Sequence, residues 1–415
     1  MKLTGELSFP GDKSISHRAL MLAALSEGKC TIKNLSTGKD VESTHQCLLS
    51  CSIESQLDNG KIRITGKPLQ NPSQILDCGN SGTTARLLAG LLAGQKVTAT
   101  LEGDHSLSSR PMNRIIDPLS KMGADVDSSD GYLPLNLIPR PLHGIQYTPP
   151  ISSAQVKSAV ILAGLGAEGE TTLIEPIKTR DHTERMLKTL GGSITLQGSR
   201  ITVSPLQQPL ETFELTIPGD PSTAAYFAAA ATLIPNSELR LINLLANPTR
   251  TGFFTVLEKM GASIEILLKN PNGGEEVHNL KISPGTLTGI TLSPEQIPTI
   301  IDELPILAIV ATQAEGRTVV TGASELRVKE CDRLQAICKN LHRMGAKITE
   351  LLDGFVITGP TSLHQARIST YNDHRIAMAF TIASLIADGP VTIDNSTCME
   401  ISCPDFKTML QAIIR

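Results

Sequence analysis

The sequence predicts an α/β protein with two lobes, in which each lobe is built from three copies of one βαβ-containing unit. Three observations predict this fold. The first is a strand that runs through Pro-Gly-Asp into a helix, which occurs at Pro10–Asp12 and again at Pro218–Asp220. The two glycines, Gly11 and Gly219, are 208 residues apart in a chain of 415, so the second half of the chain repeats the first.

The other two observations are shorter signatures that alternate along the chain. One is a predicted helix that ends in Met-Gly-Ala or a variant and leads into a β-prone run, because glycine is common just past a helix C-terminus. It occurs at Met122–Ala124, Leu190–Gly192, Met260–Ala262 and Met344–Ala346, with a weaker copy at Leu49–Cys51. The other is an Ala- and Leu-rich helix that is expected to end at Gly28, Gly94, Gly169, Gly316, Gly389 or, in one copy, Asn236. Together they divide the chain into six units of about 70 residues each.

The 208-residue offset groups the six units three and three. We expect an N-terminal lobe over residues 12–219 and a C-terminal lobe over residues 1–11 and 220–415. Because the Ala-rich helices have little polar surface, we expect them inside each lobe, with the sheets outside. The helix N-termini would then converge on an active site in the cleft between the lobes.

The composition is that of an ordinary globular protein, with 40% apolar residues, 19% charged residues and a net charge of −4. Aromatic residues make up 3% and tryptophan is absent, so stacking platforms for nucleic acid are scarce. The apolar stretches are too short for a membrane span. The first residues, Met1–Glu6, contain no apolar signal core. We therefore expect a cytoplasmic protein that binds neither nucleic acid nor membranes.

The eight cysteines form no C-x-x-C pair, although Cys47 and Cys51, and also Cys331 and Cys338, fall at helical spacing. We expect all eight to be reduced thiols. No cluster of His, Cys and carboxylate residues has the spacing of metal ligands, so the sequence predicts no metal.

The stretch Phe9–Arg18 carries the most informative chemistry. Asp12 is a good N-cap for the predicted helix. The polar side chains that follow it are Lys13, Ser14 and Arg18. Free backbone N–H groups, the positive end of the helix dipole and two cations together favour a phosphate or carboxylate ligand. A capped core helix with two solvated cations is the alternative, but the second copy contains Pro221 and Ala225 and no cation, which favours a ligand site in the first.

Further cations stand at other predicted helix starts of the first half. These stretches are Gly79–Arg86, Ser108–Arg114, Ser153–Lys157 and Thr179–Glu184. Pro111 fits the first position of its helix, which would leave Arg110 just outside it. Gln155 and Lys157 point to different faces of one helix, so at most one of them is an ordinary surface residue. Ordinary helix capping is the alternative for the Gly79 stretch and, through Thr179 or Asp181, for the Thr179 stretch.

The second half adds four charged stretches, Asn247–Arg250, Ile301–Pro305, Leu326–Leu334 and Asn372–Arg375. In the densest of them we expect Lys329 and Arg333 one helical turn apart on one helix, with Glu330 beside Arg333. A solvated, salt-bridged face is the usual explanation of such a pattern. The helix dipole disfavours cations at a helix start, however, so a bound anion explains them better.

Seven cations are thus expected near helix starts, namely Lys13, Arg18, Arg110, Arg180, Lys329, Arg333 and Arg375. In an acidic protein this indicates a small polyanionic substrate. Asp302, Glu330 and His374 are the titratable groups that we expect near these cations, which makes them candidates for acid–base work.

With these motifs the chain resembles the 5-enolpyruvylshikimate-3-phosphate synthases, and in particular the class II branch of that family. The resemblance covers nearly the whole chain. It rests on Pro10–Arg18, Gly79–Arg86, Arg110–Arg114, Ser153–Lys157, Arg180–Glu184, Asn247–Arg250, Arg327–Arg333, Asn372–Arg375 and Pro404–Phe406. It implies a monomeric transferase of the shikimate pathway, with a two-lobed fold of six units, that needs no cofactor and acts on shikimate 3-phosphate and phosphoenolpyruvate.

The resemblance also implies a role for each site residue. Shikimate 3-phosphate would be held by Lys13, Ser14, Arg18, Ser153, Gln155, Arg180, Asp302 and Lys329. Phosphoenolpyruvate would be held by Lys13, Asn80, Gly82, Arg110, Gln155, Arg333 and Arg375. The catalytic groups would be Asp302, Glu330 and Lys13. The 5-hydroxyl would attack C2 of phosphoenolpyruvate while C3 gains a proton, and phosphate would leave the tetrahedral intermediate as C3 loses one.

Two alternatives stay open. The related transferase that acts on UDP-N-acetylglucosamine has Lys-Asn in its first motif and a reactive loop cysteine. This chain has Lys13 followed by Ser14, and it has no cysteine between residues 79 and 330. The second alternative is a non-catalytic or RNA-end-processing relative of the same fold.

Two positions, Glu325 and Ile401, also differ from the Asn and Lys that some members of the family carry.

The resemblance implies an inhibitor as well. In this family glyphosate competes with phosphoenolpyruvate, and insensitive members carry Ala at the position of Gly82. We therefore expect Gly82, which lacks a Cβ atom, to leave room for the inhibitor.

Overall fold

The structure of the protein, a computed structural model, describes residues 1–58 and 60–415. The chain divides into two compact units. The N-terminal unit comprises residues 11–217 and 272–274, and the C-terminal unit comprises residues 1–10, 218–271 and 275–415.

The N-terminal unit contains the first seven helices. These are α1 (Lys13–Ala24), α2 (Lys39–Ser50), α3 (Gly82–Gly94), α4 (His105–Ser108), α5 (Asn113–Lys121), α6 (Ala154–Gly164) and α7 (His182–Thr189). Its strands are β2 (Gly28–Lys33), β3 (Glu54–Asp58), β4 (Lys61–Gly66), β5 (Leu76–Asp77), β6 (Ala99–Glu102), β7 (Asp125–Ser129), β8 (Tyr132–Ile138), β9 (Gln146–Tyr147), β10 (Thr171–Ile174), β11 (Ile194–Gln197), β12 (Arg200–Val203) and β13 (Glu214–Thr216). They form sheets with the orders β13-β2-β4-β3, β5-β6-β8-β7 and β11-β12-β10-β9.

The C-terminal unit contains the remaining helices. These are α8 (Pro221–Leu233), α9 (Gly252–Lys259), α10 (Leu304–Thr312), α11 (Arg333–Arg343), α12 (His374–Ser384) and α13 (Phe406–Ile413). Short 3₁₀ segments are η1 (Ile297–Thr299), η2 (Ile301–Glu303), η3 (Ser324–Val328) and η4 (Thr397–Ile401). Its strands are β1 (Thr4–Ser8), β14 (Glu238–Leu245), β15 (Ser263–Asn272), β16 (Glu275–Ser283), β17 (Thr291–Leu292), β18 (Gly316–Val320), β19 (Lys347–Leu351), β20 (Gly354–Gly359), β21 (His364–Ile368) and β22 (Asp388–Ile393). The sheet orders are β1-β14-β16-β15, β17-β18-β20-β19 and β21-β22.

One strand topology recurs in the sheets of both units. A leading strand pairs in parallel with a second strand, as β5 does with β6, and the second pairs antiparallel with a hairpin, as β6 does with β8 and β8 with β7. The pairs β13–β2, β9–β10, β1–β14 and β17–β18 are parallel in the same way. The last sheet keeps only the parallel pair β21–β22. This recurrence confirms the predicted α/β fold built from a repeated unit.

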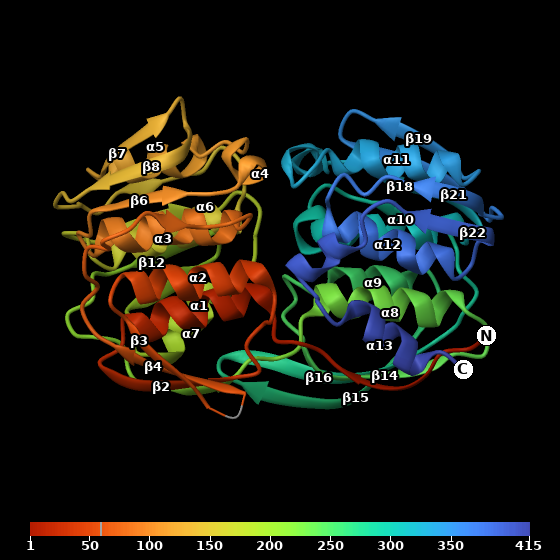
Figure 1. The fold of residues 1–415 in the computed structure, drawn as a ribbon, viewed down its shortest axis with the longest axis horizontal. Helices are drawn as coiled ribbons and strands as arrows, with labels where there is room; N and C mark the ends of the chain where they lie inside the picture. The colour runs from red at the N-terminus through yellow and green to blue at the C-terminus, as the bar shows by residue number, and fades with distance from the viewer. Residues whose placement is uncertain (59) are drawn as a thin grey trace. The chain divides into compact units, whose positions relative to one another are not determined.

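The Ala-rich helices form the interior of each unit, as predicted. In α8 every residue from Pro221 to Thr232 is buried, and α10 is buried along its whole length. In the N-terminal unit α3 packs on α6 so closely that a Cβ at Gly90 would lie 2.1 Å from the carbonyl oxygen of Ala159. Figure 1 shows α1, α2, α3 and α6 between the sheet of β2, β3 and β4 and the sheet of β6, β7 and β8.

The Met-Gly-Ala signature is confirmed as a helix end followed by a strand. Gly123, Gly191, Gly261 and Gly345 all have positive φ, between 80° and 110°, which glycine adopts without strain. Each is followed within four residues by a strand, namely β7, β11, β15 and β19.

The second signature is wrong in part. The chain leaves the helix several residues before Gly28, Gly169, Gly316 and Gly389, since α1, α6, α10 and α12 end at Ala24, Gly164, Thr312 and Ser384. Asn236 likewise lies beyond the end of α8, and only Gly94 closes its helix as expected. The four glycines have φ between 83° and 115° and lie within two residues of the start of the next strand. Their conformational freedom therefore serves the entry into a strand, whereas the helix ends by tight backbone turns.

Two local predictions about helix starts are also wrong. Pro111 does not occupy the first helical position, because Met112 is the N-cap and α5 begins at Asn113. Lys329 does not share a helix with Arg333, because the side chain of Asp332 caps α11 by accepting from Gln335 N at 3.0 Å. Lys329 therefore belongs to the extended segment before α11.

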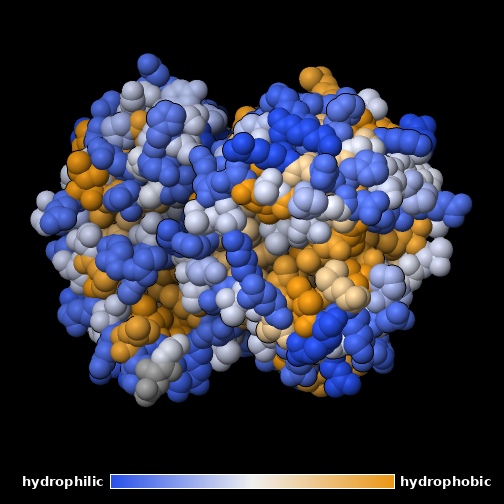
Figure 2. All heavy atoms as spheres, turned by 45° about the vertical axis from the view of Figure 1, so that its right-hand side comes forward, coloured by the Kyte–Doolittle hydropathy of each residue, from blue (hydrophilic) through white to orange (hydrophobic). Residues whose placement is uncertain are grey.

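Figure 2 shows blue and white residues over much of one face, with smaller orange patches among them. Among the described residues, none of the helices has the length and apolar character required to cross a membrane. All eight cysteines are free thiols, as predicted, and all except Cys331 are buried.

Candidate active site

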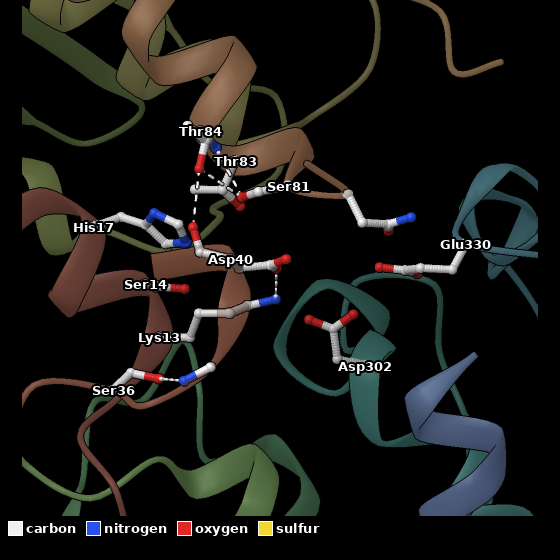
Figure 3. A network of polar contacts seen from close by, with 12 residues as sticks. Lys13, Ser14, His17, Ser36, Asp40, Ser81, Thr83, Thr84, Asp302 and Glu330 are labelled. Carbon is white, nitrogen blue, oxygen red and sulfur yellow. Dashed lines mark hydrogen bonds and ion pairs between the residues drawn. The ribbon is translucent and has the colours of Figure 1, made fainter. Parts of the chain in front are cut away.

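The start of α1 is built as predicted, with Asp12 as the N-cap that accepts from Ile15 N at 2.8 Å. Lys13 follows it, and its ammonium nitrogen lies 2.8 Å from Asp40 Oδ2 at the start of α2, as Figure 3 shows. The Lys13 side chain is 20% exposed. Sequence reasoning did not find Asp40, which is 27 residues away; the only local signal is its place in the first turn of a helix.

A buried chain of hydroxyl groups connects α1, α2 and α3. His17 Nδ1 lies 2.6 Å from Thr44 Oγ1, which lies 2.7 Å from Thr84 Oγ1. Thr84 also donates to the backbone oxygen of Asp40 at 3.1 Å or to Ser81 Oγ at 2.7 Å. Burial lowers the pKa of His17 to about 3, so its ring is neutral at ordinary pH. The network therefore joins α1, α2 and α3 through neutral groups.

The turn into α3 carries two of the predicted residues, Asn80 and Gly82, and a third, Arg110, contacts it. Ser81 caps the helix through Thr84 N at 3.1 Å. Arg110 donates to Asn80 Oδ1 at 2.6 Å and to the Asn80 backbone oxygen at 3.4 Å. A Cβ added at Gly82 would lie 2.7 Å from a guanidinium nitrogen of Arg86 and 3.6 Å from one of Arg110. Asn80, Gly82 and Arg110 therefore form one cluster.

Arg86 extends this cluster to α6. Its NH1 donates to Gln155 Oε1 at 2.7 Å, and Gln155 Nε2 donates to Thr83 Oγ1 at 3.0 Å. Arg86 is 7% exposed, so it holds Gln155 from below the surface. Sequence reasoning included Arg86 in its motif but assigned it no role.

The stretch from Ser153 opens α6 as predicted, and Ser153 Oγ caps the helix by accepting from Val156 N at 3.5 Å. Arg180, in the turn before α7, donates to Ser14 Oγ at 3.4 Å. Arg18 is 4% exposed and donates to Thr183 Oγ1 and Ser158 Oγ, both at 2.6 Å. Ser14 and Arg180 therefore meet near a surface, whereas Arg18 lies beneath them and joins α1 to α6 and α7.

In the C-terminal unit the predicted residues gather around Arg333. Its Nε donates to Asp373 Oδ2 at 2.7 Å, its NH1 to Asp302 Oδ1 at 3.3 Å and its NH2 to Glu330 Oε2 at 2.5 Å. The Arg333 side chain is 1% exposed. Burial disfavours its charge, but the facing carboxylates raise the pKa of Arg333 above its ordinary value. This single guanidinium therefore holds both predicted acid–base carboxylates, Asp302 and Glu330, in one place.

Asp302 is shared with two further cations. Arg375 donates to the Asp302 backbone oxygen at 3.2 Å and lies 3.6 Å from its carboxylate. Lys329 lies 3.8 Å from the same carboxylate and is 30% exposed. Asp373 caps α12 through Arg375 N at 2.8 Å, while the neighbouring His374 is 1% exposed. Sequence reasoning missed Asp373 as the ion-pair partner of Arg333, because a capping residue gives no sign of a second role.

Chemically, the two groups differ. The N-terminal unit presents Lys13, which pairs with Asp40, and it presents Arg110 and Arg180, which have an amide and a hydroxyl neighbour. These cations suit binding of phosphate and carboxylate oxygens. The C-terminal unit presents carboxylates held on arginine, which suits proton transfer.

Comparison with known proteins gives one family. A family model described as EPSP synthase (3-phosphoshikimate 1-carboxyvinyltransferase) matches residues 1–410. A protein of Thermodesulfovibrio yellowstonii named 3-phosphoshikimate 1-carboxyvinyltransferase is 47% identical, over 99% of this chain and 97% of its own. One of Alkaliphilus metalliredigens with the same name is 46% identical, over 100% of this chain and 98% of its own.

Solved structures agree. The structure of EPSP synthase from Acinetobacter baumannii superposes with a TM-score of 0.89 at 39% identity and covers 99% of this chain and 96% of that one. The enolpyruvyl transferase NikO from Streptomyces tendae is only 17% identical but superposes with a TM-score of 0.78, over 99% of this chain and 95% of that one. The latter likeness concerns the fold alone.

Proposed function

Because this chain belongs to the EPSP synthase family, we propose that it transfers the enolpyruvyl group of phosphoenolpyruvate to the 5-hydroxyl of shikimate 3-phosphate and releases phosphate. The family uses these two substrates, and the reaction belongs to the shikimate pathway.

Shikimate 3-phosphate is bound by hydroxyl, amide and cationic groups of the N-terminal unit. Ser14 contacts the substrate from α1, and Arg180 contacts it from the turn before α7; Arg180 NH1 lies 3.4 Å from Ser14 Oγ. Ser153 and Gln155 contact it from the start of α6, and Lys13 from the start of α1. Arg18 supports this group from beneath, since it is 4% exposed and donates to oxygens of Ser14, Ser158 and Thr183. Lys329 and Asp302 complete the set from the C-terminal unit.

Phosphoenolpyruvate is bound by Lys13, by Arg110 and by the turn that contains Asn80 and Gly82. Gln155 lies on the other side of that turn, tied to it through Arg86. Arg333 and Arg375 contribute from the C-terminal unit. Because carboxylates occupy both arginines, the substrate anion competes with Asp302 for Arg375 when it binds. The local positive charge offsets the repulsion between the two anionic substrates.

Proton transfer is assigned to Asp302, Glu330 and Lys13. One group accepts the proton of the attacking 5-hydroxyl while another protonates C3, and the roles reverse when phosphate leaves. The observation that best supports this assignment is Arg333, which bonds to Asp302 at 3.3 Å and to Glu330 at 2.5 Å. A shared guanidinium keeps both carboxylates oriented while a proton moves, and Lys13 neutralises the developing charge.

The proposal is tested by measuring phosphate release from phosphoenolpyruvate with shikimate 3-phosphate as acceptor, and with UDP-N-acetylglucosamine in parallel. Turnover with the first acceptor alone is expected; turnover with the second alone would overturn the proposal.

Glu330→Gln should bind both substrates but lower kcat by about 10²-fold or more, because the amide keeps the shape and loses the proton function. Glu258→Gln, on the exposed face of α9, is the matched control.

A further inference from the structure

The one lysine of α6, Lys157, is almost completely buried, with 2% of its surface exposed. Its ammonium nitrogen lies 2.8 Å from Glu184 Oε1 on α7. It also lies 3.0 Å and 3.1 Å from the two carboxylate oxygens of Glu175, and 3.4 Å from the backbone oxygen of Thr179. One ammonium group therefore holds two carboxylates and one carbonyl in the interior of the N-terminal unit.

The charges in this cluster do not balance. Two carboxylates face one cation, and Glu184 Oε2 has no hydrogen-bond partner among the residues that the structure describes. Burial raises the pKa of Glu184, against the lowering effect of Lys157. A buried ionic cluster of this kind adds little stability compared with apolar residues of the same size. Its value must lie in fixing positions, because charged groups in a dry interior tolerate only a narrow range of geometries.

The cluster fixes the segment that carries Arg180. Glu175 Oε1 accepts from Thr179 N at 2.9 Å and from the Thr179 hydroxyl, which closes the turn directly before Arg180. On the far side of Arg180, Glu184 is held by Lys157. The segment 175–184 is thus tied to α6 at both ends by the same ammonium group.

A second set of contacts runs beside the first. Ser158, the neighbour of Lys157, lies 2.8 Å from Thr183 Oγ1, and both hydroxyl groups receive a hydrogen bond from Arg18 at 2.6 Å. The opposite side of Arg18 donates to the backbone oxygen of Ser14 at 2.8 Å. The path from Lys157 through this layer therefore ends at Ser14, which Arg180 also contacts.

We propose that Lys157 is a positioning residue for shikimate 3-phosphate: it clamps the 175–184 segment onto α6 and thereby holds Arg180 beside Ser14. The inference rests on the proposed function, which gives Arg180 and Ser14 to that substrate. Lys157 itself does not touch the substrate, since its ammonium group is enclosed by protein oxygens. The contacts of phosphoenolpyruvate proposed for Arg110, Asn80 and Gly82 do not pass through the clamp.

Three variants test the clamp. Lys157→Met removes the cation and leaves two facing carboxylates; Lys157→Met combined with Glu184→Gln removes one charge of each sign; Glu184→Gln alone keeps Lys157 paired with Glu175. The control is Lys178→Met, in the same segment, whose side chain is 67% exposed. For each protein the two KM values and kcat are measured as a function of pH, and folding is checked by thermal unfolding.

The expected result is selective. Lys157→Met should raise KM for shikimate 3-phosphate by at least tenfold and change KM for phosphoenolpyruvate by less than twofold. Because its two carboxylates repel one another when both are ionised, this KM should improve as the pH falls, a pH dependence that the wild type and the double variant should lack. Glu184→Gln should give a smaller rise in the same KM. Lys178→Met should match the wild type.

Other outcomes decide against the inference. A folded Lys157→Met protein with unchanged constants, or with both KM values raised equally, would overturn it. If Lys157→Met fails to fold, Glu184→Gln carries the same test, and unchanged binding of shikimate 3-phosphate there would overturn the clamp. A wild type that does not turn over shikimate 3-phosphate would overturn the proposed function and the clamp together. Wild-type turnover with an insensitive variant would overturn the clamp alone.

Discussion

The two Pro-Gly-Asp helix starts share a backbone plan and differ in what they carry. Asp12 caps α1 through Ile15 N at 2.8 Å, and Asp220 caps α8 through Ser222 N at 2.7 Å. At the constant offset of 208 residues, Pro221, Ala225 and Tyr226 stand where the first copy has Lys13, His17 and Arg18. The first start carries polar and charged side chains, whereas the second continues into a helix in which every residue from Pro221 to Thr232 is buried.

A cation is nevertheless present at the second start, supplied from outside the helix. Arg250 lies 3.1 Å from Asp220 Oδ1 and 2.9 Å from Ser222 Oγ, and its side chain is 3% exposed. Lys13, in contrast, is 20% exposed and pairs with Asp40. A cation at a helix start is therefore no sign of ligand binding by itself. Its exposure and its partners decide whether it completes the fold or faces a substrate.

The largest expected effect concerns stability at the second start. Arg250→Met leaves the carboxylate of Asp220 without its buried partner, so the free energy of unfolding should fall by about 3–5 kcal/mol. The folded variant should keep the kcat/KM of the wild type. Denaturant titration and initial rates give both quantities, with Arg240→Met on the exposed side of β14 as control. A stable variant with lost activity would reverse the assignment of the two starts.

Replacing the cation at the first start should lower activity and leave stability nearly unchanged. Lys13→Met should lower kcat/KM by about 10²–10³-fold, the usual cost of removing one preorganised charge that stabilises a transition state. The free energy of unfolding should change by less than about 1 kcal/mol, since the Lys13–Asp40 pair is partly exposed. Steady-state kinetics and denaturant titration compare it with Lys39→Met at the exposed start of α2. Equal losses in the two variants would contradict the role of Lys13.

A third prediction follows from His17, which has Ala225 as its counterpart. The folded state holds the pKa of His17 at about 3, below the ordinary value of 6.5, so below pH 6.5 the unfolded chain binds a proton that the folded chain does not. Stability contributed by the neutral ring is therefore complete above pH 6.5 and falls by about 1.4 kcal/mol per pH unit below it.

The His17→Gln variant isolates this effect. Between pH 6.5 and pH 5, the free energy of unfolding of this variant should fall by about 2 kcal/mol less than that of the wild type. Denaturant titrations at several pH values measure the two slopes. Parallel slopes would show that His17 is not held neutral by the fold.

The glycines of the two starts should also respond differently to a methyl group. A Cβ at Gly11 would lie 2.0 Å from the backbone oxygen of Asn34 and 2.8 Å from the Ile217 side chain. At Gly219 the nearest atoms, of Phe9 and Asn243, lie at 3.2 Å and 3.3 Å. Gly11→Ala should cost about 3 kcal/mol of stability and Gly219→Ala less than about 1.5 kcal/mol, because a backbone oxygen cannot turn aside as a side chain can. Thermal unfolding of both proteins gives the comparison; similar shifts would mean that the two turns are equally open.

The helix caps at the two starts could be predicted from the sequence, whereas the ion-pair partners of the cations could not, and the difference has a physical cause. Caps such as Asp12, Asp220 and Ser153 depend on atoms two or three residues away, so local patterns predict them. The partners that decide function are distant: Asp40 is 27 residues from Lys13, and Asp373 is 40 from Arg333. The residues around a cation in the sequence do not indicate which distant carboxylate will become its ion-pair partner in the fold.

Helix ends show the same limit. The glycines at positions 28, 169, 316 and 389 were expected to close helices and instead lead into strands, because positive φ serves either purpose. The sequence likewise placed Lys329 on the helix of Arg333, and only the cap by Asp332 shows where that helix begins. The clamp at Lys157 could be suspected from the two faces of α6, but its partners Glu175 and Glu184 come from other segments.

The smallest expected effect concerns Gly82, whose added Cβ would meet the end of a flexible side chain rather than backbone. The guanidinium of Arg86, at 2.7 Å, would have to swing aside, and it carries Gln155 with it through their hydrogen bond. Stability should change little, in contrast to Gly11→Ala.

The discrimination between glyphosate and phosphoenolpyruvate in Gly82→Ala should change by about 1 kcal/mol, the lower end of what one methyl contributes to specificity, with glyphosate weakened more. Inhibition constants and KM values for Gly82→Ala, with Gly219→Ala as the control at a helix start that faces no substrate, measure it. Equal weakening of both ligands would mean that the displaced Arg86 disturbs Gln155, which both substrates need, and that Gly82 does not set the discrimination.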